Sequence, residues 1–139
     1  MVSGSVAGRP EQLPGPFVPN CLSALATSDG GGGAFPVVFL GLWDQGGEGN
    51  HLNRSVTVSL KRPTSMAQPK TALQYRIDDK SANPLGLYHV MGSPASPSVE
   101  QRQQLMAASK VVPVALPVSS EGTVTVLMTP NSAVMVTFA

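Results

Sequence analysis

Glycine and proline interrupt this chain so often that short strands and turns are favoured over long helices. The 139 residues include 14 glycines and 13 prolines, and the segments between them are rich in Val and Thr, which favour strands. Helices are therefore expected in only a minor part of the chain. The length fits one domain, and it excludes a (β/α)8 barrel, which needs at least about 200 residues.

Seven segments have the composition or the alternation of β-strands. Residues 55–61 (SVTVSLK) alternate polar and apolar side chains, the pattern of a half-buried strand, and Leu73, Tyr75 and Ile77 repeat it. Residues 35–43 are apolar at nearly every position and predict a central strand that is covered on both faces. The other candidate strands are residues 21–27, 111–118, 122–128 and 133–138. The predicted fold is all-β, a β-sandwich of about seven to eight strands.

One stretch departs from the strand pattern and predicts a short helix-loop-helix insertion at about residues 84–109. Pro84 suits the first turn of a helix, and Gly92 suits the position just after a helix ends. A second helix is expected to follow Ser98, because Ser98 and Gln101 have the spacing of a capping box. The insertion therefore interrupts the sandwich between its fourth and fifth strands.

The remaining composition excludes several classes of protein. Residues 1–20 hold four prolines and little apolar periodicity, so a flexible lead-in is expected there, and the sandwich domain is assigned to residues 21–139. Nine Lys and Arg against eight Asp and Glu give a net charge of +1, too balanced for a nucleic-acid-binding surface. The sequence contains no run of 18 apolar residues, so no membrane span is predicted. The N-terminus lacks the pattern of a signal peptide. Cys21 is the only cysteine, which excludes an intrachain disulfide.

No combination of residue types indicates catalysis, and no cofactor is predicted. Asp78 and Asp79 are the only adjacent acidic pair, but neighbours on a strand point to opposite faces, so a solvated strand end is expected. The glycines at 30–33 lack the Lys-Ser/Thr of a phosphate-binding loop. No G-x-S-x-G motif is present, and no signature surrounds Cys21.

No metal site is predicted either. Asp44 and Glu48 lie in a glycine-rich loop and are interpreted as turn-forming residues, because calcium ligation needs more oxygen donors at set spacing. His51 and His89 are far apart in sequence and have no nearby cysteine or paired carboxylates.

The aromatic residues and one sequon complete the candidates. Trp43, Tyr75 and Tyr88 are the only Trp and Tyr, and we interpret them as core residues rather than as the exposed aromatic platform of a carbohydrate-binding module. Asn53-Arg54-Ser55 is an N-x-S sequon at the start of a strand. Asn53 is therefore a candidate N-glycosylation site, which requires passage through the secretory pathway.

Three stretches together resemble a known family. They are residues 37–40 (VVFL) with 51–60 (HLNRSVTVSL), residues 75–78 (YRID) and residues 91–101 (MGSPASPSVEQ). In their order and spacing they resemble the C-terminal β-sandwich domain of α-L-iduronidase and related family 39 glycoside hydrolases, over about 100 residues from position 35 onward.

The resemblance implies a non-catalytic accessory domain. In that family the sandwich packs beside a (β/α)8 barrel that holds both catalytic glutamates, and none of this chain's carboxylates corresponds to them. The parent enzyme would hydrolyse an α-L-iduronoside in glycosaminoglycan breakdown, or a β-xyloside, and the family implies a lysosomal or secreted location. The chain alone is then expected to be inactive, and to be a fragment, a partial gene or a barrel-less paralogue.

Two other functions stay open at this point. One is a stand-alone carbohydrate-binding module, and the other is a protein-interaction module of the fibronectin kind. Fold alone does not decide among the three, because β-sandwiches carry many functions.

Overall fold

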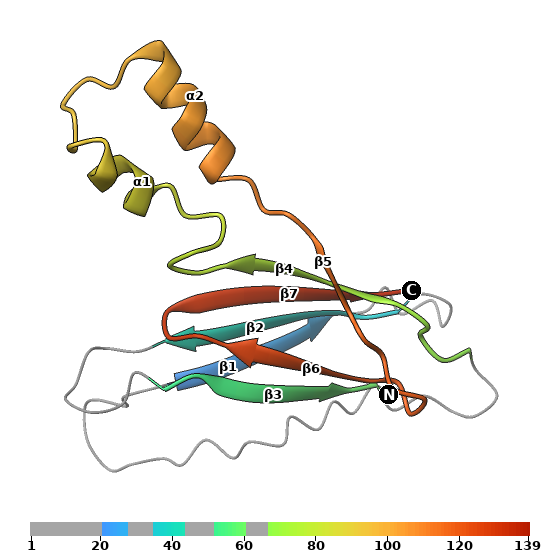
Figure 1. Ribbon diagram of the computed structural model, residues 1–139. Coiled ribbons are helices and arrows are strands. Elements are labelled where there is room, and N and C mark those ends of the chain that lie inside the picture. The colour runs from blue at the N-terminus through green and yellow to red at the C-terminus, as the bar shows by residue number, and fades with distance from the viewer. Residues whose placement is uncertain (1–20, 28–34, 44–51, 61–66) are drawn as a thin grey trace, which may run out of the picture.

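The computed structural model describes residues 21–27, 35–43, 52–60 and 67–139 (Figure 1). The elements are β1 (Cys21–Thr27), β2 (Val37–Trp43), β3 (Arg54–Ser59), β4 (Ala72–Ile77), α1 (Leu85–Val90), α2 (Val99–Ala108), β5 (Val114–Leu116), β6 (Thr123–Met128) and β7 (Ser132–Phe138). Each predicted strand overlaps one of these strands, and both helices fall inside the predicted insertion. The expected lead-in, residues 1–20, lies outside the described residues.

The described strands form two antiparallel sheets. The larger sheet has the order β1-β2-β7-β4-β5, and the smaller one pairs β3 with β6. Figure 1 shows the β3–β6 pair lying along one face of the larger sheet. The prediction of an all-β sandwich is therefore confirmed.

Alternate side chains of both sheets meet in one hydrophobic core. Strand residues point in turn to opposite faces, so each strand contributes every second residue. The buried apolar residues are Val38, Leu40, Leu42, Val56, Val58, Leu60, Ala72, Val124, Val126, Met128, Val134, Val136 and Phe138. A slip of one residue in any of these strands would turn its apolar set outward.

The outward faces of the two sheets differ in chemistry. The outward residues of the smaller sheet, here called the hydroxyl face, include Ser55, Thr57, Ser59, Thr123 and Thr125. The outward residues of the larger sheet, here called the apolar face, include Leu25, Phe39, Trp43, Leu73, Tyr75, Ile77 and Met135. Hydroxyl groups suit contact with water, whereas the apolar face carries large hydrophobic side chains that the described residues do not bury.

The structure corrects the prediction for residues 35–43. This segment was expected to be covered on both faces, but only Val38, Leu40 and Leu42 are buried. Phe39 is 42% exposed and Trp43 is 60% exposed. The β3–β6 sheet covers one face of β2, and no described element covers the other. A nearly continuous apolar run therefore has one face in the core and one face that the described elements leave exposed.

The two helices form a helical arm, residues 85–108, that extends away from the sheets in Figure 1. The predicted capping box is confirmed: the Gln101 backbone N–H donates to Ser98 Oγ at 3.2 Å, and Ser98 N–H donates to Gln101 Oε1 at 2.9 Å. Gly92 follows α1 with φ +84°, a conformation that glycine adopts without strain. Neither helix buries a residue, and among the described residues no helix is long and apolar enough to cross a membrane.

Candidate functional site

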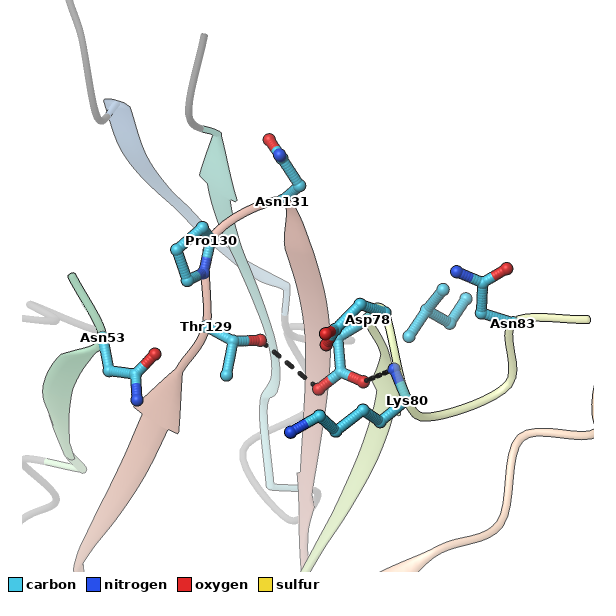
Figure 2. Close-up of a pocket in the computed structure, with 9 residues that line it drawn as sticks. Asn53, Asp78, Lys80, Asn83, Thr129, Pro130 and Asn131 are labelled. Atoms are coloured by element: carbon cyan, nitrogen blue, oxygen red, sulfur yellow. Dashed lines mark hydrogen bonds between the residues drawn. The ribbon is translucent and has the colours of Figure 1, made fainter. Parts of the chain in front are cut away.

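A pocket between described residues lies at one end of the sandwich, where three connections meet. It has a volume of about 480 Å³. Its lining residues are Asn53, Ile77, Asp78, Asp79, Lys80, Asn83, Thr129, Pro130 and Asn131. Asn53 precedes β3, residues 78–83 follow β4, and residues 129–131 join β6 to β7. Figure 2 shows these side chains around the pocket, which we call the end pocket.

Asp78 organises the turn that follows β4. Its Oδ1 accepts hydrogen bonds from the backbone N–H groups of Lys80 at 2.9 Å and Ser81 at 2.7 Å. Its Oδ2 accepts from the Thr129 hydroxyl at 3.3 Å and pairs with Arg76 Nη1 at 3.2 Å (Figure 2 shows the bonds to Lys80 and Thr129). The turn therefore closes around a carboxylate whose two oxygens are both occupied.

This geometry corrects the expectation of a solvated strand end. Asp78 is only 7% exposed, whereas its neighbour Asp79 is exposed. Arg76 lies on the inward side of β4, where it reaches both Asp78 and the backbone carbonyl of Leu127 in β6. Asp78 and Arg76 thus tie the larger sheet to the smaller one, a structural role that the sequence did not indicate.

The same contacts determine how Asp78 titrates. Burial alone would raise the pKa of its carboxyl group, but the backbone N–H groups of Lys80 and Ser81, with Arg76, stabilise the charged form and outweigh it. The pKa of Asp78 therefore lies below the ordinary value for an aspartate. A carboxylate held ionised in this way is unsuited to donate a proton near neutral pH.

The other polar residues of the end pocket are suited to hydrogen bonding. Asn83 Oδ1 accepts a hydrogen bond from the Leu85 backbone N–H at 3.0 Å, so this residue fixes the entry to α1. Asp79 and Lys80 are exposed at the rim. Carboxylate, amide and ammonium groups can form hydrogen bonds with a hydroxyl-rich ligand.

The remaining sequence candidates do not gather at this site. His89 lies on the helical arm, where its Nδ1 is 3.0 Å from Ser93 Oγ. Asp44, Glu48, His51 and the glycines at 30–33 lie outside the described residues. Within the described part of the chain, no three His, Cys, Asp or Glu side chains come together as a metal site would require.

The prediction that Trp43 is a core residue is wrong. Trp43 is 60% exposed because it ends β2 on the apolar face, and it lines a second hollow of about 300 Å³ that shares Ile77 and Asn131 with the end pocket. Tyr75 is half-buried on the same face, and Tyr88 donates a hydrogen bond from its hydroxyl to the Pro94 carbonyl at 3.1 Å in the arm. The resemblance implied a sandwich that packs beside a barrel, but the sequence did not indicate which residues form the apolar face.

Asn53 is exposed at the start of β3, on the edge of the end pocket (Figure 2). The sequon residues Arg54 and Ser55 are exposed as well. The position is therefore sterically open to a glycan, and whether Asn53 carries one stays a prediction.

Comparisons with known proteins give matches among solved structures. No protein-family profile matches the sequence, and no curated protein matches it significantly. A monomeric β-xylosidase from Caulobacter crescentus CB15 superposes with a TM-score of 0.61 at 23% identity, over 83% of this chain and 25% of that enzyme. The GH39 enzyme from Xanthomonas axonopodis pv. citri superposes with a TM-score of 0.57 at 19% identity, again over 83% of this chain and 25% of that one. This chain therefore spans a quarter of the length of each enzyme and shares the fold of that quarter.

Proposed function

We propose that this chain is a non-catalytic accessory domain of a family 39 glycoside hydrolase. The observation that carries the proposal is an apolar face that no described strand or helix covers, on a sandwich whose fold recurs as a quarter of two enzymes, one a β-xylosidase and one of GH39. Its partner would be a (β/α)8 catalytic barrel. The domain would stabilise that barrel and hold the loops near its active site.

The acidic residues support a role without chemistry. A retaining glycosidase needs two carboxyl groups about 5–5.5 Å apart, one as acid and one as nucleophile. Asp78 is occupied by four hydrogen-bond partners, and Glu100 accepts from the Ser98 hydroxyl on the exposed arm. The lowered pKa of Asp78 leaves it unsuited as the acid of such a pair, and Glu100 does not line the end pocket.

Within the family, we propose the α-L-iduronidase branch over the β-xylosidases. The segments 51–60, 75–78 and 91–101 carry that likeness, and the branch implies glycosaminoglycan breakdown in a lysosomal or secreted enzyme. A glycan on Asn53 belongs to the same proposal. A fall in mass after peptide-N-glycosidase treatment of the protein from its native source would test it.

We expect the purified 139-residue chain to show no turnover of aryl β-xylosides or aryl α-L-iduronosides, because the resemblance implies that the catalytic carboxylate pair is held by a barrel and maps neither member onto this chain. The assay is release of the aryl group, with the Caulobacter crescentus β-xylosidase as the active control. Turnover that persists through purification and disappears in Asp79→Asn would contradict the accessory role.

Transcript sequencing across the codon of Met1 tests whether a catalytic barrel is encoded together with this domain. A reading frame that continues upstream into a barrel with an N-E-P motif and a later strand-end Glu supports it. Transcripts from which no barrel can be translated count against it.

A second candidate function is carbohydrate binding, and the exposure of Trp43 favours it. An exposed indole beside a pocket of amide and carboxylate groups is an arrangement that binds sugar rings. A glycan array with the isolated chain separates the two functions. Binding that Trp43→Ala abolishes would favour the carbohydrate-binding module.

A further inference from the structure

Two adjoining hollows lie in the apolar face. The first, of about 300 Å³, lies beside Trp43 and above Gly41. The second, of about 370 Å³, lies above Phe39 and Tyr75. Ala133 lines both hollows. The apolar face is therefore indented at its centre rather than flat.

The first hollow arises from the register of the strands. Ser23, Gly41 and Ala133 are aligned across β1, β2 and β7, so three small residues form one row. The neighbouring row holds Phe39 and Met135, whose side chains are much taller. A Cβ atom at Gly41 would come within 2.9 Å of Ser23 Oγ, so the row of small side chains is closely packed. The first hollow is thus built into the sheet, whereas the second is also lined by Val111, which precedes β5.

The apolar face is also uncharged. None of the outward residues of β1, β2, β7 and β4 is Asp, Glu, Lys or Arg. Large side chains stand open on it, among them Ile77, which is 49% exposed, and Leu25, which is 61% exposed. Contiguous apolar surface of this kind marks an interaction site in soluble proteins. The hydroxyl face, on the same domain, has the opposite character.

We infer that the apolar face is the surface on which the catalytic module packs, with an α-helix of that module placing apolar side chains in the two hollows. The inference rests on the proposed function. In both similar enzymes three quarters of the chain lies outside the part that this domain matches, and the outer layer of a (β/α)8 barrel is a ring of helices. The rows of Phe39 and Gly41 are two residues apart, about 7 Å along a strand. Side chains at i and i+4 on a helix are about 6 Å apart, so two of them fit the two hollows.

The chain contains two natural reporters for this face. Cys21 and Trp43 are its only cysteine and only tryptophan, and they are paired across β1 and β2 at one end of the apolar face. Cys21 is exposed. A helix packed on this face would cover the Cys21 thiol.

The experiment compares the isolated chain with a chimera of the Caulobacter crescentus β-xylosidase in which this chain replaces the matching quarter. Alkylation of Cys21 by iodoacetamide is followed by mass spectrometry of its peptide. We expect alkylation at least about tenfold slower in the chimera, because thiol reactivity depends on access. Ala133→Glu, which places a charge between the hollows, should restore the fast rate. The matched control Thr125→Glu, on the hydroxyl face of β6, should keep the slow rate.

A chimera that turns over aryl β-xylosides while Cys21 reacts at the rate of the isolated chain would overturn the inference and leave the proposed function standing. The inference also fails if Thr125→Glu releases the protection and Ala133→Glu does not. If transcripts show that no barrel is encoded together with this chain, the proposed function fails. The inference then fails with it, because no barrel helix is present to occupy the two hollows.

A second experiment needs no chimera: sedimentation velocity measures whether the isolated chain self-associates through the apolar face. An apolar face without charged residues, exposed in the described part of the chain, should make the wild-type chain and Thr125→Glu self-associate as concentration rises. Ala133→Glu should stay monomeric. A wild-type chain that remains a monomer at high concentration would show that the face is no interface.

Discussion

Replacing Asp78 with alanine is expected to lower the free energy of unfolding by about 3 kcal/mol, because a buried ion pair and its hydrogen bonds are broken from one side. Arg76 would lose its carboxylate partner in a site where its side chain is 17% exposed. The backbone N–H groups of Lys80 and Ser81 would lose their acceptor at the same time. Urea unfolding at concentrations where the chain is monomeric measures the loss.

Two variants make this prediction specific. Asp79→Ala, one residue along and exposed, should change the free energy of unfolding by no more than about 0.5 kcal/mol. Asp78→Asn keeps an amide oxygen for the two N–H groups but removes the charge, and we expect a loss of about 1–2 kcal/mol. Equal effects at positions 78 and 79 would show that the turn does not depend on the buried carboxylate.

The free energy of unfolding should also depend on pH through the ionisation of Asp78. The pKa of Asp78 is lowered in the folded state, so its contribution is fully present above the unfolded-state pKa of about 3.9 and is lost as the pH falls through the folded value. The free energy of unfolding should therefore fall more steeply below about pH 4 in the wild type than in Asp78→Asn.

Met128→Ala should lower the free energy of unfolding by about 3 kcal/mol, through lost burial and the cavity left behind. Met128 is fully buried at the end of β6, whereas the preceding Leu127 is 51% exposed. Leu127→Ala should cost no more than about 0.5 kcal/mol, because its side chain leaves the core intact. Thermal or urea unfolding of the two variants gives the comparison. A reversal of the two costs would mean that β6 pairs with β3 one residue out of register.

The strands and the insertion could be predicted because their signals are local. The alternation in residues 55–59 and 123–128 gives the inward and outward faces directly, and the Ser98–Gln101 spacing specifies the start of α2. These signals depend on neighbours in the chain, so a single sequence is enough to interpret them.

Burial of the outward face could not be predicted in the same way. The run at residues 37–43 is apolar on both faces, and composition does not say whether the same chain or another one covers each face. On β3 the outward residues are Ser and Thr, whereas on β2 they are apolar. This difference was the one sequence signal that the outward face of β2 is not a water-facing surface like that of β3. Asp78 was misjudged for a related reason: its partners Arg76 and Thr129 are brought together only by the packing of the two sheets.

The helical arm has a consequence for how this domain tolerates change in length. Both of its helices lack buried residues, so the arm can open without exposing the sandwich core, as a cooperative unit of its own. The β4–β7 and β2–β7 pairings involve no residue of the arm. We therefore expect insertions and deletions between α1 and α2 to meet little resistance from the sandwich.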